Sequence, residues 1–225
     1  MGEDLIPVTP ISMATDQSSI YTALRQYKWV HRPHLARRQC IRLAGLLSGF
    51  MSMHRDCFAP DGWDIATAVP SLSGRQGPHP LGAVLKMAWP SHLYYSRVLD
   101  PMVDKWPTTP APGVMPATVP VPAKNENQTS CSDFACDPHV VRGLRILLVD
   151  DTLTTGAHIQ SAAIALLRSG AAEVLPLVIG RRLTPGRMTT SRTLRWARLP
   201  ENRWSLENCL HCRAGERPSL NLLTS

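Results

Sequence analysis

The stretch Arg145-Ile-Leu-Leu-Val-Asp-Asp-Thr-Leu-Thr-Thr-Gly-Ala-His158 decides the fold of this chain. Ile146 to Val149 are consecutive apolar residues, which is typical of a parallel strand that is buried on both faces. Asp150 and Asp151 follow at the carboxyl end of that strand, where open α/β sheets bind ligands. Thr154 to Gly156 then allow a tight turn, and the residues after it carry apolar side chains at helical spacing. The stretch therefore predicts a strand, an acidic pair, a turn and a helix.

A turn of this kind suits a phosphate. It directs backbone N–H groups and a helix N-terminus at one point in space, and the threonine hydroxyls add further donors. Two carboxylates beside a phosphate would repel it, so we expect them to hold another part of the same ligand. Sugar hydroxyls or a bound divalent cation would fill that role. A phosphorylated sugar meets both requirements.

The same stretch resembles the loop that binds phosphoribosyl pyrophosphate (PRPP) in the type I phosphoribosyltransferases, and its flanks resemble the branch similar to the competence protein ComF. The resemblance implies an α/β fold with a mostly parallel, twisted sheet flanked by helices, a mobile lid loop and a small hood. It also implies that Asp150 and Asp151 hold the ribose hydroxyls, together with Mg²⁺ that arrives on PRPP. The turn that cradles the 5′-phosphate would comprise Thr152, Thr154, Thr155, Gly156, Ala157 and His158.

Two positions depart from the family pattern. Thr152 stands where the family usually has an aliphatic residue, and His158 stands where it usually has Thr or Ser. Two other interpretations are open. The chain could be a doubly wound domain in which the acids only cap a helix, or a PRPP-binding fold that has lost catalysis.

A second strand-loop-helix unit precedes the first. Asp64 to Val69 read as a strand, a flexible glycine-containing segment follows, and a helix is predicted from Pro80. By resemblance this segment is the pyrophosphate loop, formed by Pro70, Ser71, Leu72, Ser73, Gly74 and Arg75. Arg75 would then be the catalytic contact to the leaving pyrophosphate. The alternative is an ordinary surface turn.

Other segments fill out the fold. Helices are predicted over 19–29 and from Pro33 onward, and a strand over 174–179, where Pro176 should occupy an edge position or a bulge because it lacks an N–H. Seven prolines between Pro101 and Pro122 exclude a regular helix there, and by resemblance this part of the chain supplies the lid. Phe134 resembles a phenylalanine that ComF-like proteins place before the central strand.

The composition indicates one domain with appendages. We expect a phosphoribosyltransferase-like domain over 1–185, with the proline-rich insertion at about 100–130, and an extension over 186–225. The net charge of +7 implies an anionic partner, such as nucleic acid, a membrane surface or a small polyanion like PRPP. No segment reads as a membrane span or a signal peptide, so a cytoplasmic protein with reduced thiols is expected.

The extension contains the pair Cys209 and Cys212, whose spacing could seat one edge of a zinc site. Cys131 and Cys136 could supply the remaining ligands. The alternative is a set of free thiols in a tail.

These expectations favour an Mg²⁺-dependent phosphoribosyltransferase that acts on PRPP and a small acceptor. Hypoxanthine-guanine transferases have a carboxylate two residues before the loop glycine, and Thr154 at that position cannot act as the base. A 6-oxopurine acceptor is therefore less favoured. The alternative is a non-catalytic PRPP sensor or DNA-uptake accessory that binds nucleic acid through Arg37, Arg38 and Arg42. A homodimer is compatible with either function.

Overall fold

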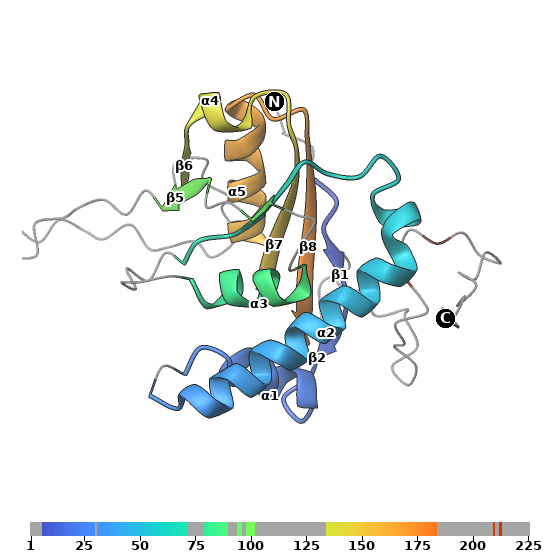
Figure 1. Ribbon diagram of the computed structural model, residues 1–225, viewed down its shortest axis with the longest axis vertical. Helices are drawn as coiled ribbons and strands as arrows, with labels where there is room; N and C mark the ends of the chain where they lie inside the picture. The colour runs from blue at the N-terminus through green and yellow to red at the C-terminus, as the bar shows by residue number, and fades with distance from the viewer. Residues whose placement is uncertain are drawn as a thin grey trace, which may run out of the picture.

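A six-stranded sheet organises the chain (Figure 1), and its strands run in the order β1-β8-β7-β3-β4, with β2 also paired to β8. The computed structural model describes residues 6–29, 31–71, 79–89, 94–95, 98–101 and 134–183, and, from the C-terminal segment, Cys209 and Cys212. Within that part of the chain, every pairing in this sheet is parallel. The strands are β1 (Thr9–Pro10), β2 (Met13–Ala14), β3 (Ile65–Ala68), β4 (Tyr94–Tyr95), β7 (Arg145–Leu153) and β8 (Glu173–Arg182).

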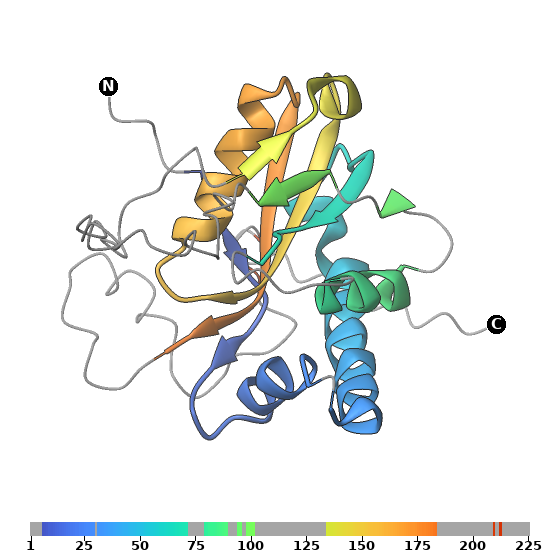
Figure 2. The ribbon, with the colours of Figure 1, turned by 90° about the vertical axis from the view of Figure 1, so that its left-hand side faces the viewer.

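Helices cover both faces of the sheet, and a two-stranded antiparallel ribbon lies beside one of them (Figures 1 and 2). The helices are α1 (Ser19–Gln26), α2 (Pro33–Phe58), α3 (Pro80–Ala88), α4 (Pro138–Val141) and α5 (Ala157–Arg168), and the ribbon is β5 (Leu99–Pro101) with β6 (Phe134–Cys136). The predicted α/β class with a mostly parallel sheet and flanking helices is thus confirmed.

Two hydrophobic clusters form the core, one on each face. Leu147 and Val149 of β7 face the cluster that α1, α2 and α3 cover, whereas Ile146 and Leu148 face the cluster beneath α5 and the β5–β6 ribbon. All four side chains are fully buried. Because successive strand residues point to opposite faces, an uninterrupted apolar run is what a strand covered on both sides requires. Phe134 belongs to the second cluster.

The long helix α2 begins at Pro33, as predicted. Pro33 occupies the first turn, where its missing N–H costs nothing, and the buried face contains Cys40, Leu43, Leu47, Phe50 and Met51. The same face continues through His54 to Phe58. α1 ends at Gln26, earlier than predicted, since Tyr27 and Lys28 form a turn.

Pro176 is not on an edge strand, because β8 lies between β1 and β7. The described pairing of β8 with β7 continues in register past Pro176, so the residue is not at a bulge either. The carbonyl oxygen of Val178 accepts a hydrogen bond from the backbone N–H of Ile11, on the β1 side of the strand. Residues two apart along a strand direct their backbone groups to the same side, so the nitrogen of Pro176 also faces the β1 side. β1 pairs with β8 only from Leu177 onward. The missing N–H therefore deprives no strand of a ladder bond, which is why proline is tolerated here.

No helix among the described residues is long and apolar enough to cross a membrane. The predicted lid lies almost entirely outside the described residues.

Candidate functional site

The candidate site is built where β7 passes into α5. Asp150 and Asp151 lie in the last part of β7, which continues to Leu153, a longer strand than the apolar run alone predicts. Gly156 then adopts a left-handed conformation with φ of 85° and serves as the N-cap of α5. A side chain there would be strained and would meet Leu153 at 3.2 Å. The predicted strand, turn and helix follow one another as expected, but the acidic pair lies inside the strand rather than after it.

The N-terminus of α5 opens toward this turn. Thr155 Oγ1 accepts a hydrogen bond from the backbone N–H of Ala157 at 3.4 Å, and Gly156 contributes no side-chain cap. The first-turn N–H groups of a helix have no intrahelical acceptor, so those of His158 and Ile159 depend on the turn or on a ligand. Thr154, Thr155 and His158 are exposed. The arrangement is one that binds an anion through backbone donors.

Asp151 is buried and has two partners from the segment that follows α1. Tyr27 donates its hydroxyl hydrogen to Asp151 Oδ2, and Lys28 forms an ion pair with the same oxygen. Burial, first, and then the charge of Asp151 raise the pKa of Tyr27 well above its ordinary value. Tyr27 is therefore a neutral donor that orients Asp151, while Lys28 compensates its charge.

Asp150 has a different environment, although it is adjacent in sequence. Asp150 Oδ1 accepts a hydrogen bond from the backbone N–H of Asp151 at 2.8 Å. Burial, first, and then the neighbouring charge of Asp151 raise the pKa of Asp150 to about 7, against the smaller opposing effects of that hydrogen bond and of Lys28. The two carboxylates are thus unequal: Asp151 has a cation beside it, and burial raises the pKa of Asp150.

A cavity of about 330 Å³ adjoins the turn. Its lining combines threonines from the end of β7 and from the turn with side chains from α1, the turn after α1 and the end of β8, namely Tyr21, Leu24, Arg25, Lys28, Thr152, Thr154 and Arg182. The guanidinium carbons of Arg25 and Arg182 lie 5.7 and 5.3 Å from the centre of the Tyr21 ring. Lys28 pairs with Asp151 and Arg182 pairs with Asp16 at 3.7 Å, so part of the positive charge around this cavity is already compensated.

The second predicted loop is only partly described. Pro70 and Ser71 follow β3, whose Ala68 pairs with Val149, and the backbone N–H of Val69 donates to Val149 O at 2.9 Å. The start of the predicted pyrophosphate loop therefore lies next to the start of the acidic pair. Leu72, Ser73, Gly74 and Arg75 lie outside the described residues.

Comparisons with known proteins do not assign a family. No protein-family model matches the chain, and no curated protein matches it. Among solved structures, the chain is similar to one described as the allosteric regulatory enzyme of purine biosynthesis, with 19% identity and a TM-score of 0.32. That likeness covers 60% of this chain and only 26% of the other. We therefore derive the function from the residues of the site.

Several residues that line the site could not be predicted from the sequence. Arg25 and Arg182 are separated from the acidic pair along the chain, and nothing in their own sequence context marks them. Tyr27 and Lys28 do have a signal, since the pattern around this pair resembles the N-terminal part of ComF-like transferases.

The two cysteines of the C-terminal extension do have partners, although not the predicted ones. Cys209 and Cys212 lie together with His54 and Cys57 of α2. Cys136 instead lies in β6, where its thiol contacts the backbone oxygen of Asp137. Cys131 lies outside the described residues.

Proposed function

We propose that this chain is a phosphoribosyltransferase, which binds PRPP and transfers its 5-phosphoribosyl group to a small acceptor with release of pyrophosphate. One observation carries the proposal. The acidic pair of β7 is followed directly by a turn with a left-handed glycine and by the N-terminus of α5. A donor that has a phosphate at one end of a sugar and hydroxyls nearby fits both halves of this site.

Different residues would bind different parts of the donor. The 5′-phosphate would accept hydrogen bonds from the backbone of the turn and from the hydroxyls of Thr154 and Thr155. The ribose hydroxyls would donate to the carboxylates of Asp150 and Asp151. Tyr27 restricts the rotation of Asp151, so that part of the ribose contact is pre-oriented in the free protein.

The residues present also fit Mg²⁺. Asp150 and Asp151 place two carboxylates side by side, and Lys28 pairs with Asp151, so a ligand that brings positive charge would relieve their mutual repulsion. Asp150 and Asp151 would hold the ion through the ribose hydroxyls of PRPP. When bound, Mg²⁺ supplies compensation of the negative charge that develops on pyrophosphate.

The transfer requires little covalent chemistry from the protein. The bond between C1 of the ribose and the pyrophosphate oxygen breaks, a lone pair of the acceptor forms the new bond to C1, and the electron pair of the broken bond leaves with pyrophosphate. Positive charge develops on the ribose meanwhile, and the negative charge of the acidic pair would stabilise it electrostatically. Arg75 would contact the departing pyrophosphate.

The adjoining cavity is the natural place for the acceptor. Thr152 and Thr154 line it from the donor side, and Tyr21 offers an aromatic surface on the other. Arg25 would favour an acceptor that carries a negative charge, and Thr154 leaves the position of a purine-deprotonating carboxylate without a base.

Calorimetric titration with PRPP and Mg²⁺ tests donor binding. The double variant Asp150→Asn with Asp151→Asn should lose binding, while Glu173→Gln should bind as the parent does. Glu173 is a suitable control because it is an exposed carboxylate that pairs with Arg145 at the opposite end of β7 and β8. An unchanged PRPP affinity in the double variant would refute the assignment of the acidic pair.

Turnover is a separate question. Incubation with PRPP, Mg²⁺ and a pool of metabolites should release pyrophosphate and give a new ribose-phosphate adduct by mass spectrometry. The alternative is a PRPP sensor or DNA-uptake accessory without turnover, which is favoured by one observation: Arg37, Arg38 and Arg42 are all exposed on α2. PRPP binding without acceptor-dependent release, together with salt-sensitive retention of DNA or RNA, would support that alternative.

A further inference from the structure

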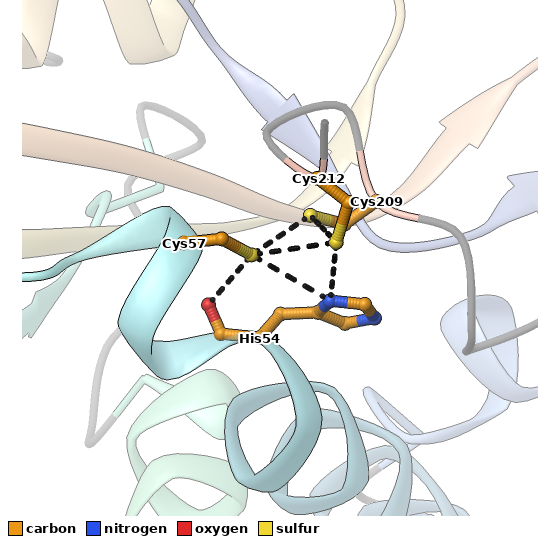
Figure 3. A group of neighbouring side chains, drawn as sticks. All are labelled: His54, Cys57, Cys209 and Cys212. Atoms are coloured by element: carbon orange, nitrogen blue, oxygen red, sulfur yellow. Dashed lines mark hydrogen bonds between the residues drawn. The ribbon is translucent and has the colours of Figure 1, made fainter. Parts of the chain in front are cut away.

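Four metal-binding side chains converge at the C-terminal end of α2 (Figure 3). His54 and Cys57 lie three residues apart on this helix, a spacing that puts both on one face. Cys209 and Cys212, also three residues apart, approach them from the C-terminal segment. One donor atom from each side chain lies within 4.8 Å of all the others. None of these residues belongs to the proposed donor site.

The separations match the edges of a tetrahedron. The Sγ–Sγ distances are 3.3 Å for Cys57 to Cys209, 3.5 Å for Cys57 to Cys212 and 3.3 Å for Cys209 to Cys212. His54 Nδ1 lies 3.3 Å from Cys212 Sγ and 3.7 Å from Cys57 Sγ. A tetrahedral zinc ion with ordinary bond lengths would separate two thiolate sulfurs by about 3.8 Å and a sulfur from an imidazole nitrogen by about 3.5 Å. Small adjustments of the side chains suffice to reach that geometry.

Contacts among the four donor atoms stabilise this cluster only weakly. Thiols are weak hydrogen-bond donors and weak acceptors, so three of them and one imidazole nitrogen gain little from mutual contact. The three cysteines are thiols and form no disulfide within the described residues. His54 is completely buried, and its ring lies 4.9 Å from that of Phe50, so packing fixes the direction of Nδ1. The imidazole is thus oriented toward the sulfurs by the core itself.

We propose that His54, Cys57, Cys209 and Cys212 bind one structural zinc ion. Three thiolates and one imidazole are a set that zinc uses in closed structural sites, and four protein ligands leave no position for water or substrate. The softness of thiolate sulfur disfavours Mg²⁺ and Ca²⁺ here.

The zinc ion attaches the C-terminal segment to α2. The ligand pairs are separated by 152 to 158 residues along the chain. Cys209 packs against the hydrophobic cluster that α1, α2 and α3 cover. Closing so long a loop restricts the unfolded chain more than the folded one, as a crosslink does. The ion therefore stabilises the fold rather than taking part in transfer.

The test uses the full chain, expressed with Zn²⁺ and purified under reducing conditions without chelator. Elemental analysis should give about one zinc per chain. Cys209→Ser with Cys212→Ser should lose it, while Cys136→Ser should keep it, since that half-buried thiol lies in β6 outside the cluster. Cys57→Ser should weaken zinc affinity at least about 100-fold, because even loss of an outer partner costs 10–100-fold.

A second readout does not depend on the stability of variants. The metal-free parent chain, refilled with Co²⁺, should show the strong visible bands of tetrahedral cobalt and the near-ultraviolet charge-transfer band of thiolate ligands. A parent chain that contains no zinc and gives neither band with Co²⁺ would overturn the proposal. So would a double cysteine variant that still holds one zinc, or a Cys209–Cys212 disulfide that persists under reducing conditions.

Discussion

Replacing Asp150 by asparagine should make the protein more stable while removing its ligand affinity. The amide retains an oxygen that can accept the hydrogen bond from the backbone N–H of Asp151, so the local geometry has no reason to change. What the substitution removes is a buried negative charge beside Asp151. Residues that bind ligands often carry such a cost in the free protein.

The magnitude follows from proton linkage. The folded chain raises the pKa of Asp150 from 3.8 to about 7, so between these values the folded state keeps a proton that the unfolded state has lost. Stability from this group is present below about pH 4 and is lost as the pH rises to about 7. Each pH unit in that window is worth about 1.4 kcal/mol, which gives about 3 kcal/mol between pH 5 and pH 7. We expect about half of this, roughly 1.5 kcal/mol, because Asp150 is only partly buried and water screens its charge.

Urea denaturation of the parent chain and of Asp150→Asn at pH 5 and pH 8 measures this effect. The stability advantage of the variant should be larger at pH 8 than at pH 5 by about 1.5 kcal/mol. Glu173→Gln, which removes an exposed carboxylate, should show no comparable pH dependence. An advantage that is the same at both pH values, or that grows toward pH 5, would refute the raised pKa and with it the unequal roles of the two aspartates.

Three further substitutions probe the elements around the pair. Tyr27→Phe removes the buried hydrogen bond to Asp151 and should lower the free energy of unfolding by about 1–3 kcal/mol in urea denaturation; no loss would mean that the bond is not made. Gly156→Ala places a Cβ at a φ of 85° and 3.2 Å from Leu153, so it should lower stability by about 1 kcal/mol or more and weaken calorimetric PRPP binding; normal affinity would argue against a phosphate on this turn. Gly180→Ala places a Cβ 2.5 Å from Cδ1 of the buried Leu24 and should cost about 1–3 kcal/mol in thermal unfolding, since the Leu24 side chain must move within the core; an unchanged melting temperature would contradict that packing.

The sequence predicts the parts of this fold that depend on local pattern. The apolar run from Ile146 to Val149 can only be satisfied by burial on both faces, and that requirement identifies a central strand and the edge at which Asp150 and Asp151 must lie. The proline at the first turn of α2 and the spacing of its apolar residues fix the start and the buried face of that helix. The predicted edge position or bulge for Pro176 was wrong, because a proline is tolerated in a central strand where no neighbouring strand needs a hydrogen bond from its nitrogen.

The remaining features depend on contacts between distant segments. Lys28 reaches Asp151 across more than a hundred residues, and the pairing follows from the way α1 packs on the sheet, which no local pattern encodes. His54 and Cys57 are hidden for a different reason. On an amphipathic helix they read as two more core positions, and their role emerges only when Cys209 and Cys212 are placed beside them. The spacing of the second pair indicated zinc, but spacing alone cannot name the partner pair.

The zinc cluster lies at the C-terminal end of α2, whereas the contact between α2 and α1 lies nearer the other end of α2, close to the residues that orient Asp151. This separation makes the two proposals independent. α2 contacts α1 through Gln39, whose amide donates to Gln26 at 3.0 Å just before Tyr27 and Lys28 begin. His54 follows Gln39 by fifteen residues, which is about 22 Å along a helix. A metal at the far end can stabilise α2 against unfolding without moving the residues that orient Asp151, because the intervening turns are packed against the core. Zinc removal should therefore lower the melting temperature while the chains that remain folded keep their PRPP affinity. A parallel loss of both would mean instead that α2 transmits the state of its last turn to the acidic pair.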